Sequence, residues 1–140
     1  DTIQAAVLDV KIRYLGEYIV SRNEMASFYD DAFNGMQELE VPMRASYSDH
    51  VFHQYTLKVK NEQRDNLKAY LAELGIPSMV YYPIPLYKQN AFKTYSRADF
   101  RLSITEELCQ SVLSLPIHTE VDYDEISFIC DSVKRFFKNS

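Results

Sequence analysis

The sequence lacks several residue types and patterns that common functions require. Its 140 residues include no tryptophan and only three glycines, so there is no G-x-G-x-x-G or other glycine-rich loop to cradle a phosphate. The two cysteines, Cys109 and Cys130, form neither a C-x-x-C pair nor a disulfide framework, and free thiols fit a reducing compartment. No apolar run approaches the roughly 20 residues of a membrane-spanning helix, and no signal peptide is visible. We therefore expect a cytoplasmic protein with no membrane partner.

Positive charge is also scarce. The formal net charge is −5, whereas nucleic-acid binding needs clustered lysines and arginines that contact phosphates. The basic residues Lys134, Arg135 and Lys138 end a predicted helix, where cations suit the helix dipole. The acidic pairs Asp30–Asp31 and Glu106–Glu107 are interpreted as solvated helix faces and first-turn partners of the helix dipole. The charge pattern therefore argues against nucleic acid as a partner.

Catalytic and metal-binding patterns are missing as well. The sequence has no H-E-x-x-H, no G-x-S-x-G and no recognisable Ser–His–Asp set. His50, His53 and His118 lack ligand spacing with acids or cysteines, so no metal site is expected. Cys109 falls inside a predicted helix, which is typical of packing and not of a nucleophile. No residue is therefore proposed as catalytic.

The helical pattern begins close to the N-terminus. From Gln4 to Phe33, apolar residues recur at helical spacing, which predicts one long helix with a weak point at Gly16. The Asn34–Gly35 pair ends it. The buried stripe of this helix is expected to comprise Leu8, Ile12, Leu15, Ile19, Ala26, Tyr29 and Phe33.

Strand patterns follow the long helix. Residues 51–60 alternate between apolar and polar side chains, which predicts a half-buried strand. A short strand is predicted near Pro42–Tyr47, and another at Ser78–Tyr82. The buried face of the main strand is expected to carry His53, Tyr55, Leu57 and Val59.

Three more helices complete the predicted fold. Asn61 is expected to cap the first, which ends at Gly75. The second is predicted over Thr105–Val112. The third should begin at Asp122, because Glu125 follows three residues later in a capping box. The predicted class is α+β, with a small, mostly antiparallel sheet covered by helices and preceded by a long N-terminal linking helix.

Aromatic residues are abundant, with eleven tyrosines and eight phenylalanines. The stretch YYPIPLYKQNAF, residues Tyr81–Phe92, combines several of them with two prolines. Pro83 and Pro85 fix their own φ and push the preceding residues into extended geometry, so the stretch is not a regular helix. From the residues alone, two interpretations stay open. The stretch either presents side chains to a ligand at low entropic cost or forms a stiff loop that closes a sheet edge.

Four motifs, in order and spacing, resemble a known family. They are D-x-x-Q-A-A at Asp1–Ala6, HVFHQY at His50–Tyr55, YYPIPL at Tyr81–Leu86 and S-L-P-I-H at Ser114–His118. Nearly the whole chain resembles the C-terminal part of the DegT-like sugar aminotransferases, which are pyridoxal-phosphate enzymes of the aspartate-aminotransferase fold (fold type I). These enzymes aminate nucleotide-linked keto sugars for cell-surface polysaccharide or amino-sugar biosynthesis.

The resemblance implies that the cofactor and the substrate contacts belong to different domains of the parent enzyme. This chain would be a single domain, with residues 1–35 as the linking helix and 36–140 as the small α/β domain of a homodimeric enzyme. The large domain, which carries pyridoxal phosphate and the Schiff-base lysine, is expected to be absent. The chain alone should therefore be inactive and bind no cofactor, whereas the parent enzyme would use pyridoxal phosphate and a glutamate donor. The lysines that do not match the cofactor motif are Lys11, Lys58, Lys60, Lys88 and Lys93.

The resemblance also implies where the substrate binds. In the family, the loop that corresponds to YYPIPL projects into the partner subunit's site and touches the sugar. Two positions depart from the family pattern. Tyr87 stands where the family usually has histidine, and Thr119 replaces the proline after His118, which is interpreted as a structural hydrogen-bonding residue. The candidate substrate-binding residues are Tyr81, Tyr82, Pro83 and Gln89.

The alternative is a stand-alone ligand-binding or regulatory interaction module, since some proteins of that family were first described as regulatory. The two interpretations differ in what the long helix should show. A chain that works beside a large domain should expose apolar surface on this helix, whereas a self-sufficient module should not.

Overall fold

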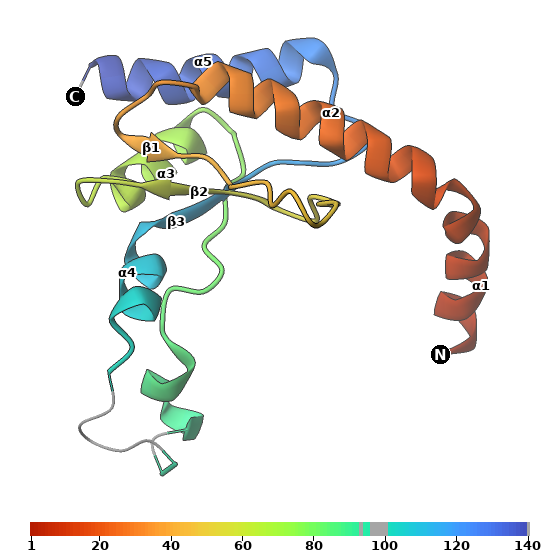
Figure 1. The fold of residues 1–140 in the computed structure, drawn as a ribbon, viewed down its shortest axis with the longest axis horizontal. Coiled ribbons are helices and arrows are strands. Elements are labelled where there is room, and N and C mark those ends of the chain that lie inside the picture. Colours follow the sequence, from red (N-terminus) through yellow and green to blue (C-terminus); the bar gives the residue numbers. More distant parts are fainter. Residues whose placement is uncertain (93, 96–100, 140) are drawn as a thin grey trace.

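A computed structural model describes residues 1–92, 94–95 and 101–139 of the chain. A small sheet lies beneath two long helices, α2 and α5 (Figure 1), and α3 packs against α5 and β3. The predicted α+β class with a small antiparallel sheet is confirmed. The elements are α1 (Thr2–Lys11), α2 (Leu15–Phe33), β1 (Leu39–Glu40), β2 (Tyr55–Val59), α3 (Arg64–Glu73), α4 (Ser103–Ser111), β3 (Val112–Leu115) and α5 (Tyr123–Lys138).

The predicted N-terminal helix forms, but it bends between α1 and α2. The interruption is one turn of 3-10 helix, Ile12–Tyr14, just before the predicted weak point at Gly16. On the N-terminal side of this turn, α1 points away from the sheet and does not pack against it (Figure 1). None of its residues is buried. The long helix therefore has an inner part that joins the core and an outer part that leaves it.

The predicted stripe on this helix is right only for its inner part. In α2, Ala26, Tyr29 and Phe33 are buried in the core. The prediction is wrong for Leu8, Ile12 and Leu15, which are exposed. Leu8 lies on α1, which the bend directs away from the sheet (Figure 1), and Ile12 and Leu15 lie in the bend and directly after it.

The sheet is antiparallel, in the order β1-β2-β3. The register sets Tyr55 opposite Leu115 and Leu57 opposite Leu113, so both strands contribute apolar side chains to the core under α2 and α5. The predicted face of the main strand is confirmed for Tyr55, Leu57 and Val59. It is wrong for His53, which is exposed and precedes the strand.

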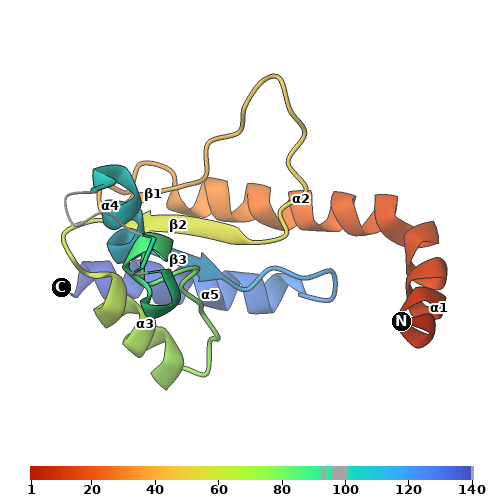
Figure 2. The same ribbon diagram turned by 90° about the horizontal axis from the view of Figure 1, so that it is seen from below.

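The predicted strand near Pro42–Tyr47 is also wrong. The first strand is Leu39–Glu40, which pairs with the end of β2. Pro42 has no N–H group to extend this pairing, and residues 41–54 form a loop that projects from the sheet (Figure 2). Near the end of this loop, Phe52 has a positive φ of 43°, which is outside the extended geometry of a strand. The strand β2 therefore begins only at Tyr55.

Asn61 does not cap α3, contrary to prediction. Asn61 and Glu62 take positive φ values of 54° and 58°, and the amide of Gln63 donates to the carbonyl oxygen of Lys60 at 3.2 Å. These residues form a tight turn, and asparagine tolerates its left-handed geometry better than most residues. The helix therefore begins at Arg64.

The strand β3 was not predicted. It follows α4 without a connecting loop, and Leu113, Ser114 and Leu115 are all buried, so no alternation marks it in the sequence. The predicted strand Ser78–Tyr82 shrinks to an isolated bridge in which Met79 pairs with Ser114. A short chain segment thus lies along the outer edge of β3.

The last helix agrees with its prediction. The Asp122 side chain accepts a 2.8 Å hydrogen bond from the amide of Glu125, and the Glu125 side chain accepts a 3.2 Å bond from the amide of Asp122. This is the expected capping box. Cys109 and Cys130 are free and buried, as predicted for packing residues.

The interpretation of Asp30 as part of a solvated face is wrong. Its carboxylate accepts a hydrogen bond from the hydroxyl of Tyr55 at 2.7 Å and two from the guanidinium of Arg44 at 2.9 and 2.7 Å. These contacts connect α2 to the central strand and to the projecting loop. Sequence spacing does not reveal them, since Arg44 and Tyr55 are distant from Asp30 in the chain.

Candidate substrate-contact site

The four candidate substrate-binding residues lie on or beside an irregular segment between Met79 and α4. We call residues 80–86 the aromatic arm. It leaves the edge of β3 and descends away from the sheet (Figure 1). Tyr81 and Tyr82 are 41% and 69% exposed, and their rings meet edge to face with 5.7 Å between centroids. Both tyrosines are therefore available to a ligand.

The prolines of the arm have different environments. Pro83 is exposed, whereas Pro85 is buried and its carbonyl oxygen accepts a 2.9 Å hydrogen bond from the amide of Lys88. This bond begins a turn of 3-10 helix, Leu86–Lys88. Pro85 thus fixes the end of the arm, and Pro83 restricts the backbone beside the exposed tyrosines.

Gln89 and His118 serve local hydrogen bonds. The side-chain amide of Gln89 lies 3.5 Å from the carbonyl oxygen of Ile84, so it reaches back to the arm. Support of the arm by Gln89 stays a prediction. The Nδ1 atom of His118 accepts a 3.3 Å bond from the amide of Glu120, which agrees with the structural role assigned to this histidine.

A polar cluster at the base of the arm was missed from the sequence. The Tyr87 hydroxyl donates a short hydrogen bond to the carboxylate of Glu106, and the ammonium of Lys88 lies 3.0 Å from the same carboxylate. Glu106 lies in the first turn of α4, as predicted for a partner of the helix dipole. Its carboxylate is not simply solvated, because Tyr87 and Lys88 bind it. Its pKa is lowered, first by the bond from Tyr87 and then by Lys88. The pKa of Tyr87 is raised by desolvation and by its bond to Glu106.

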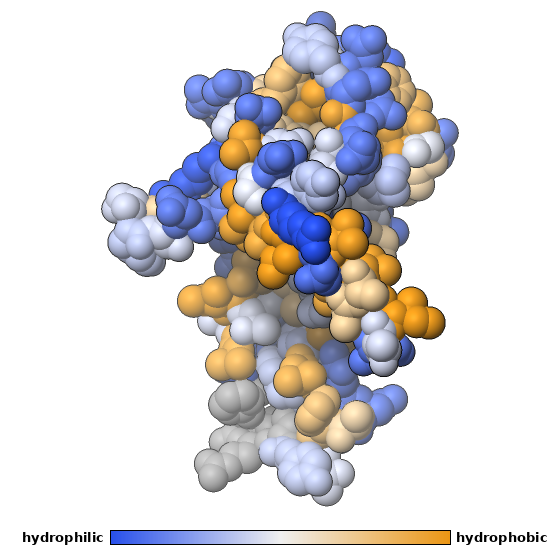
Figure 3. Space-filling view, turned by 90° about the vertical axis from the view of Figure 1, so that its right-hand side faces the viewer, coloured by the Kyte–Doolittle hydropathy of each residue, from blue (hydrophilic) through white to orange (hydrophobic). Residues whose placement is uncertain are grey.

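An apolar surface lies on the N-terminal part of the chain. Figure 3 shows hydrophobic side chains gathered on the side of the molecule that carries α1. Exposed patches of this kind usually mark contact with another protein or domain, so the expected exposed surface on the long helix is confirmed. Ile3, Val7 and Val10 are spaced four and three residues apart and so share one side of α1, which we call the N-terminal apolar face. Exposed apolar residues on other sides of this segment or after it are Leu8, Ile12, Tyr14 and Leu15.

Comparison with known sequences supplies the family. The sequence profile described as the DegT/DnrJ/EryC1/StrS aminotransferase family matches residues 1–134. The chain belongs to this family. It is 33% identical over 141 aligned residues to a pleiotropic regulatory protein of Geobacillus stearothermophilus, covering 99% of this chain and 37% of the relative. It is 31% identical to dTDP-3-amino-3,6-dideoxy-alpha-D-galactopyranose transaminase of Aneurinibacillus thermoaerophilus, covering 97% of this chain and 36% of the relative.

Solved structures of the family share the fold. A DegT DnrJ EryC1 StrS aminotransferase from Brucella abortus superposes with a TM-score of 0.86 and 36% sequence identity, over 97% of this chain and 35% of that one. The chain thus spans about a third of the length of these three relatives. Its architecture is that of one part of a fold type I sugar aminotransferase.

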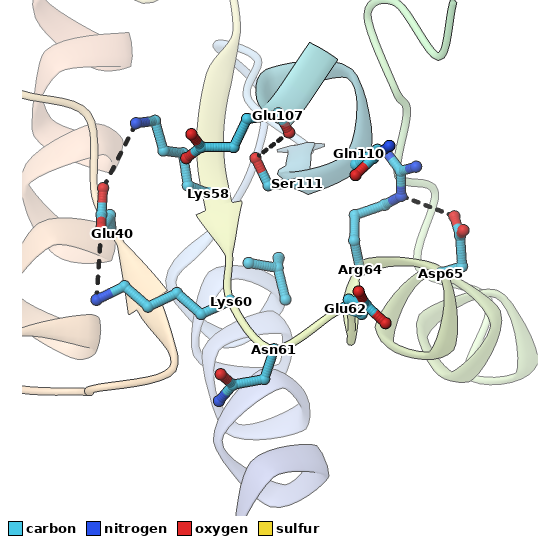
Figure 4. A pocket seen from close by; sticks show the side chains of 11 residues that line it. Glu40, Lys58, Lys60, Asn61, Glu62, Arg64, Asp65, Glu107, Gln110 and Ser111 are labelled. Atoms are coloured by element: carbon cyan, nitrogen blue, oxygen red, sulfur yellow. Dashed lines mark hydrogen bonds and ion pairs between the residues drawn. The ribbon is translucent and has the colours of Figure 1, made fainter. Parts of the chain in front are cut away.

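Membership of an aminotransferase family implies pyridoxal phosphate as the cofactor, and a cavity that holds it needs particular residues. A Schiff base needs a lysine with a free amine, and a pyridine ring needs an apolar or aromatic wall. One cavity of about 560 Å³ contains two lysines (Figure 4). The ammonium groups of Lys58 and Lys60 both pair with Glu40, at 3.6 and 3.4 Å. The one apolar residue of the lining is Val59, and none is aromatic. These residues do not fit the cofactor.

The described part of the chain offers no metal site and no membrane span. Within residues 1–92, 94–95 and 101–139, no three His, Cys, Asp or Glu side chains are grouped so as to hold a metal ion. In the same ranges, no helix combines the length and hydrophobicity needed to cross a bilayer.

Proposed function

We propose that this chain is the substrate-side domain of an aminotransferase that aminates a nucleotide-linked keto sugar. One observation carries the proposal most directly: a chain of this family presents two exposed tyrosines on a proline-restricted arm. The rings of Tyr81 and Tyr82 offer apolar surface for a sugar face, and their hydroxyls offer hydrogen bonds to sugar oxygens. Pro83 lowers the entropy lost when the arm orders around a ligand. The arm binds and orients the sugar and takes no chemical part.

The cofactor belongs to a different domain in this proposal. Pyridoxal phosphate supplies the electron sink for amino transfer, and the lysine that carries it lies outside this chain. Residues 1–35 link the two domains, and residues 36–140 form the small domain. The N-terminal apolar face packs against the cofactor-binding domain or the second subunit of a homodimer. The donor is glutamate, the enzyme acts in the cytoplasm, and its product enters cell-surface polysaccharide or amino-sugar biosynthesis.

A second candidate function is a stand-alone regulatory or ligand-binding module. The relative named as a pleiotropic regulatory protein favours it. The exposure of α1 argues against this candidate. None of the residues of α1 is buried, whereas a self-sufficient domain should bury the apolar side chains of its helices. Binding of another protein to α1 of this chain in the absence of any sugar nucleotide would support the second candidate.

Reductive trapping tests whether the chain carries its own cofactor lysine. The purified chain is incubated with pyridoxal phosphate and reduced with borohydride, which fixes any Schiff base to a lysine. We expect only weak labelling spread over surface lysines, no labelling of one lysine in stoichiometric amount, and no transaminase activity with glutamate. Stoichiometric labelling of a single lysine, together with turnover of a keto sugar, would refute the proposal.

A further inference from the structure

Both ends of the aromatic arm are fastened to one continuous segment of the fold. At the first end, the amide of Met79 donates to the carbonyl oxygen of Ser114 at 3.0 Å, and the amide of Ser114 donates back to Met79 at 2.8 Å. At the second end, the side chains of Tyr87 and Lys88 bind Glu106. Ser114 lies in β3 and Glu106 lies in α4, and β3 follows α4 directly. The arm therefore bridges two points of a single helix–strand unit.

The unit itself is held in place by a buried arginine. The side chain of Arg64 is 8% exposed, and its Nη1 atom donates to the carbonyl oxygens of Cys109 and Val112, both at 3.1 Å. These two residues flank the junction of α4 and β3. A guanidinium that satisfies carbonyls at the end of a helix also suits the helix dipole. The junction is thus fixed to α3, and the arm is attached to a rigid support.

The second end of the arm is joined to α4 through side chains. The first end is a pair of backbone bonds, which every residue type except proline can make. The second uses the Tyr87 hydroxyl, the Glu106 carboxylate and the Lys88 ammonium, and the backbone of Leu102 also hydrogen-bonds the Tyr87 side chain. Glu106 is only 25% exposed, so its bond to Tyr87 is partly shielded from competing water. A substitution at either partner therefore weakens this end without removing the backbone bonds of the first end.

We propose that Tyr87 and Glu106 are positioning residues whose hydrogen bond fixes the direction of the aromatic arm and thereby sets the affinity for the sugar nucleotide. The first part of the proposal concerns the chain itself. The second part rests on the proposed function, because it assumes that Tyr81 and Tyr82 touch the sugar. Tyr87 and Glu106 do not contact the substrate in this account; they act through the arm.

Hydrogen exchange tests the first part on the purified chain, without any ligand. The reporters are the amides of Lys88 and Gln89, which bond to the carbonyl oxygens of Pro85 and Leu86 at 2.9 and 3.1 Å. Tyr87→Phe removes only the hydroxyl, and we expect about tenfold faster exchange of both reporters, since the bond lost stabilises the closed turn by about one typical hydrogen bond. The amide of Met79 should keep its rate. Equal acceleration at Met79 would indicate global destabilisation and overturn the proposal.

Substitutions at Glu106 provide a graded series with a matched control. Glu106→Ala removes the contacts to both Tyr87 and Lys88, so it should accelerate exchange at least as much as Tyr87→Phe does. Glu106→Gln keeps an acceptor oxygen but loses the charge, so exchange of the reporter amides should fall between that of wild type and Glu106→Ala. Glu107→Ala removes the adjacent, exposed carboxylate of the same helix and should leave both reporters unchanged. If Glu107→Ala accelerates the reporters as much as Glu106→Ala does, the proposal is wrong.

Kinetics of the holoenzyme test the second part. Tyr87→Phe should raise KM for the sugar nucleotide several-fold and leave KM for the amino donor unchanged. The Tyr81→Phe, Tyr82→Phe double variant separates the two hypotheses. If the double variant raises KM for the sugar and Tyr87→Phe does not, the arm contacts the substrate and the positioning role is refuted. If neither variant changes KM, the proposed function of the arm is refuted as well, whereas the exchange result for the chain still stands.

Discussion

The hydroxyl of Tyr55 donates a 2.7 Å hydrogen bond to the carboxylate of Asp30, which joins the central strand β2 to helix α2. The other oxygen of this carboxylate binds the guanidinium of Arg44, which lies 4.7 Å from the centre of the Phe52 ring. The HVFHQY motif, which contributed to the family resemblance, thus holds the projecting loop against α2. Tyr55, the tyrosine that ends this motif, stabilises the fold through its bond to Asp30.

Tyr55→Phe should therefore destabilise the chain. The substitution keeps the buried ring and removes one hydrogen bond to a charged acceptor, so we expect a loss of about 1–3 kcal/mol in the free energy of unfolding. Urea denaturation measures it. Tyr47→Phe is the control, because Tyr47 is 91% exposed and its hydroxyl should contribute almost nothing. An equal effect of the two substitutions would contradict the role of the Tyr55–Asp30 bond.

Stability should fall in alkaline solution. Burial raises the pKa of Cys130 from an ordinary 9.0 to about 12 and also raises the pKa of Tyr29 and Tyr55. The unfolded chain loses these protons first, so it binds fewer protons than the folded chain, and unfolding becomes more favourable as pH rises above 9.0. Each group contributes at most about 1.4 kcal/mol per pH unit.

Urea midpoints measured from about pH 8 to about pH 11 should therefore decrease. Cys130→Ala should make the decrease shallower just above the ordinary thiol pKa, whatever its effect at neutral pH. A flat profile in the unsubstituted chain would show that these groups ionise equally well in the folded and unfolded states.

A matched pair of leucines tests whether α1 packs against the rest of the chain. Leu67 in α3 is 0% exposed and Leu8 in α1 is 64% exposed. Leu67→Ala should cost about 2–5 kcal/mol in the free energy of unfolding, whereas Leu8→Ala should change it by less than about 0.5 kcal/mol. A large cost for Leu8→Ala in the isolated chain would mean that α1 packs against something in solution, contrary to the structure.

The capping box of α5 gives a further quantitative prediction. Asp122→Ala removes the acceptor for the amide of Glu125, and the loss of such a cap typically costs about 1 kcal/mol. Asp131→Ala removes a carboxylate from the middle of the same helix and serves as the control. Thermal unfolding followed by circular dichroism distinguishes the two variants. A midpoint lowered equally by both would show that net charge, and not the cap, is responsible.

Local signals in the sequence predicted the elements that local chemistry determines. The capping box of Asp122 and Glu125 correctly predicted the start of α5, because both hydrogen bonds of this motif lie within one helical turn. Alternation identified the buried face of β2. The bend after α1 was anticipated beside Gly16, but the exposure of Leu8 and Leu15 was not, since burial depends on what lies next to a helix and not on its own periodicity.

Long-range contacts explain what the sequence did not reveal. β3 is short and buried on both faces, so its position is set by pairing with β2 and not by an internal pattern. The base of the arm joins Tyr87 to Glu106, which lie 19 residues apart with no helical or strand register between them. The arm itself was located from its prolines and from the resemblance, because Pro83 and Pro85 restrict the backbone locally.

The most direct test of the central claim is the steady-state kinetics of the Tyr81→Phe, Tyr82→Phe variant in the aminotransferase that contains this chain. If the arm binds the sugar, loss of both hydroxyls should raise KM for the nucleotide sugar about tenfold or more, while KM for the amino donor stays unchanged. An unchanged KM for the nucleotide sugar, or an equal rise for both substrates, would contradict the assignment of the aromatic arm as the substrate-contact site.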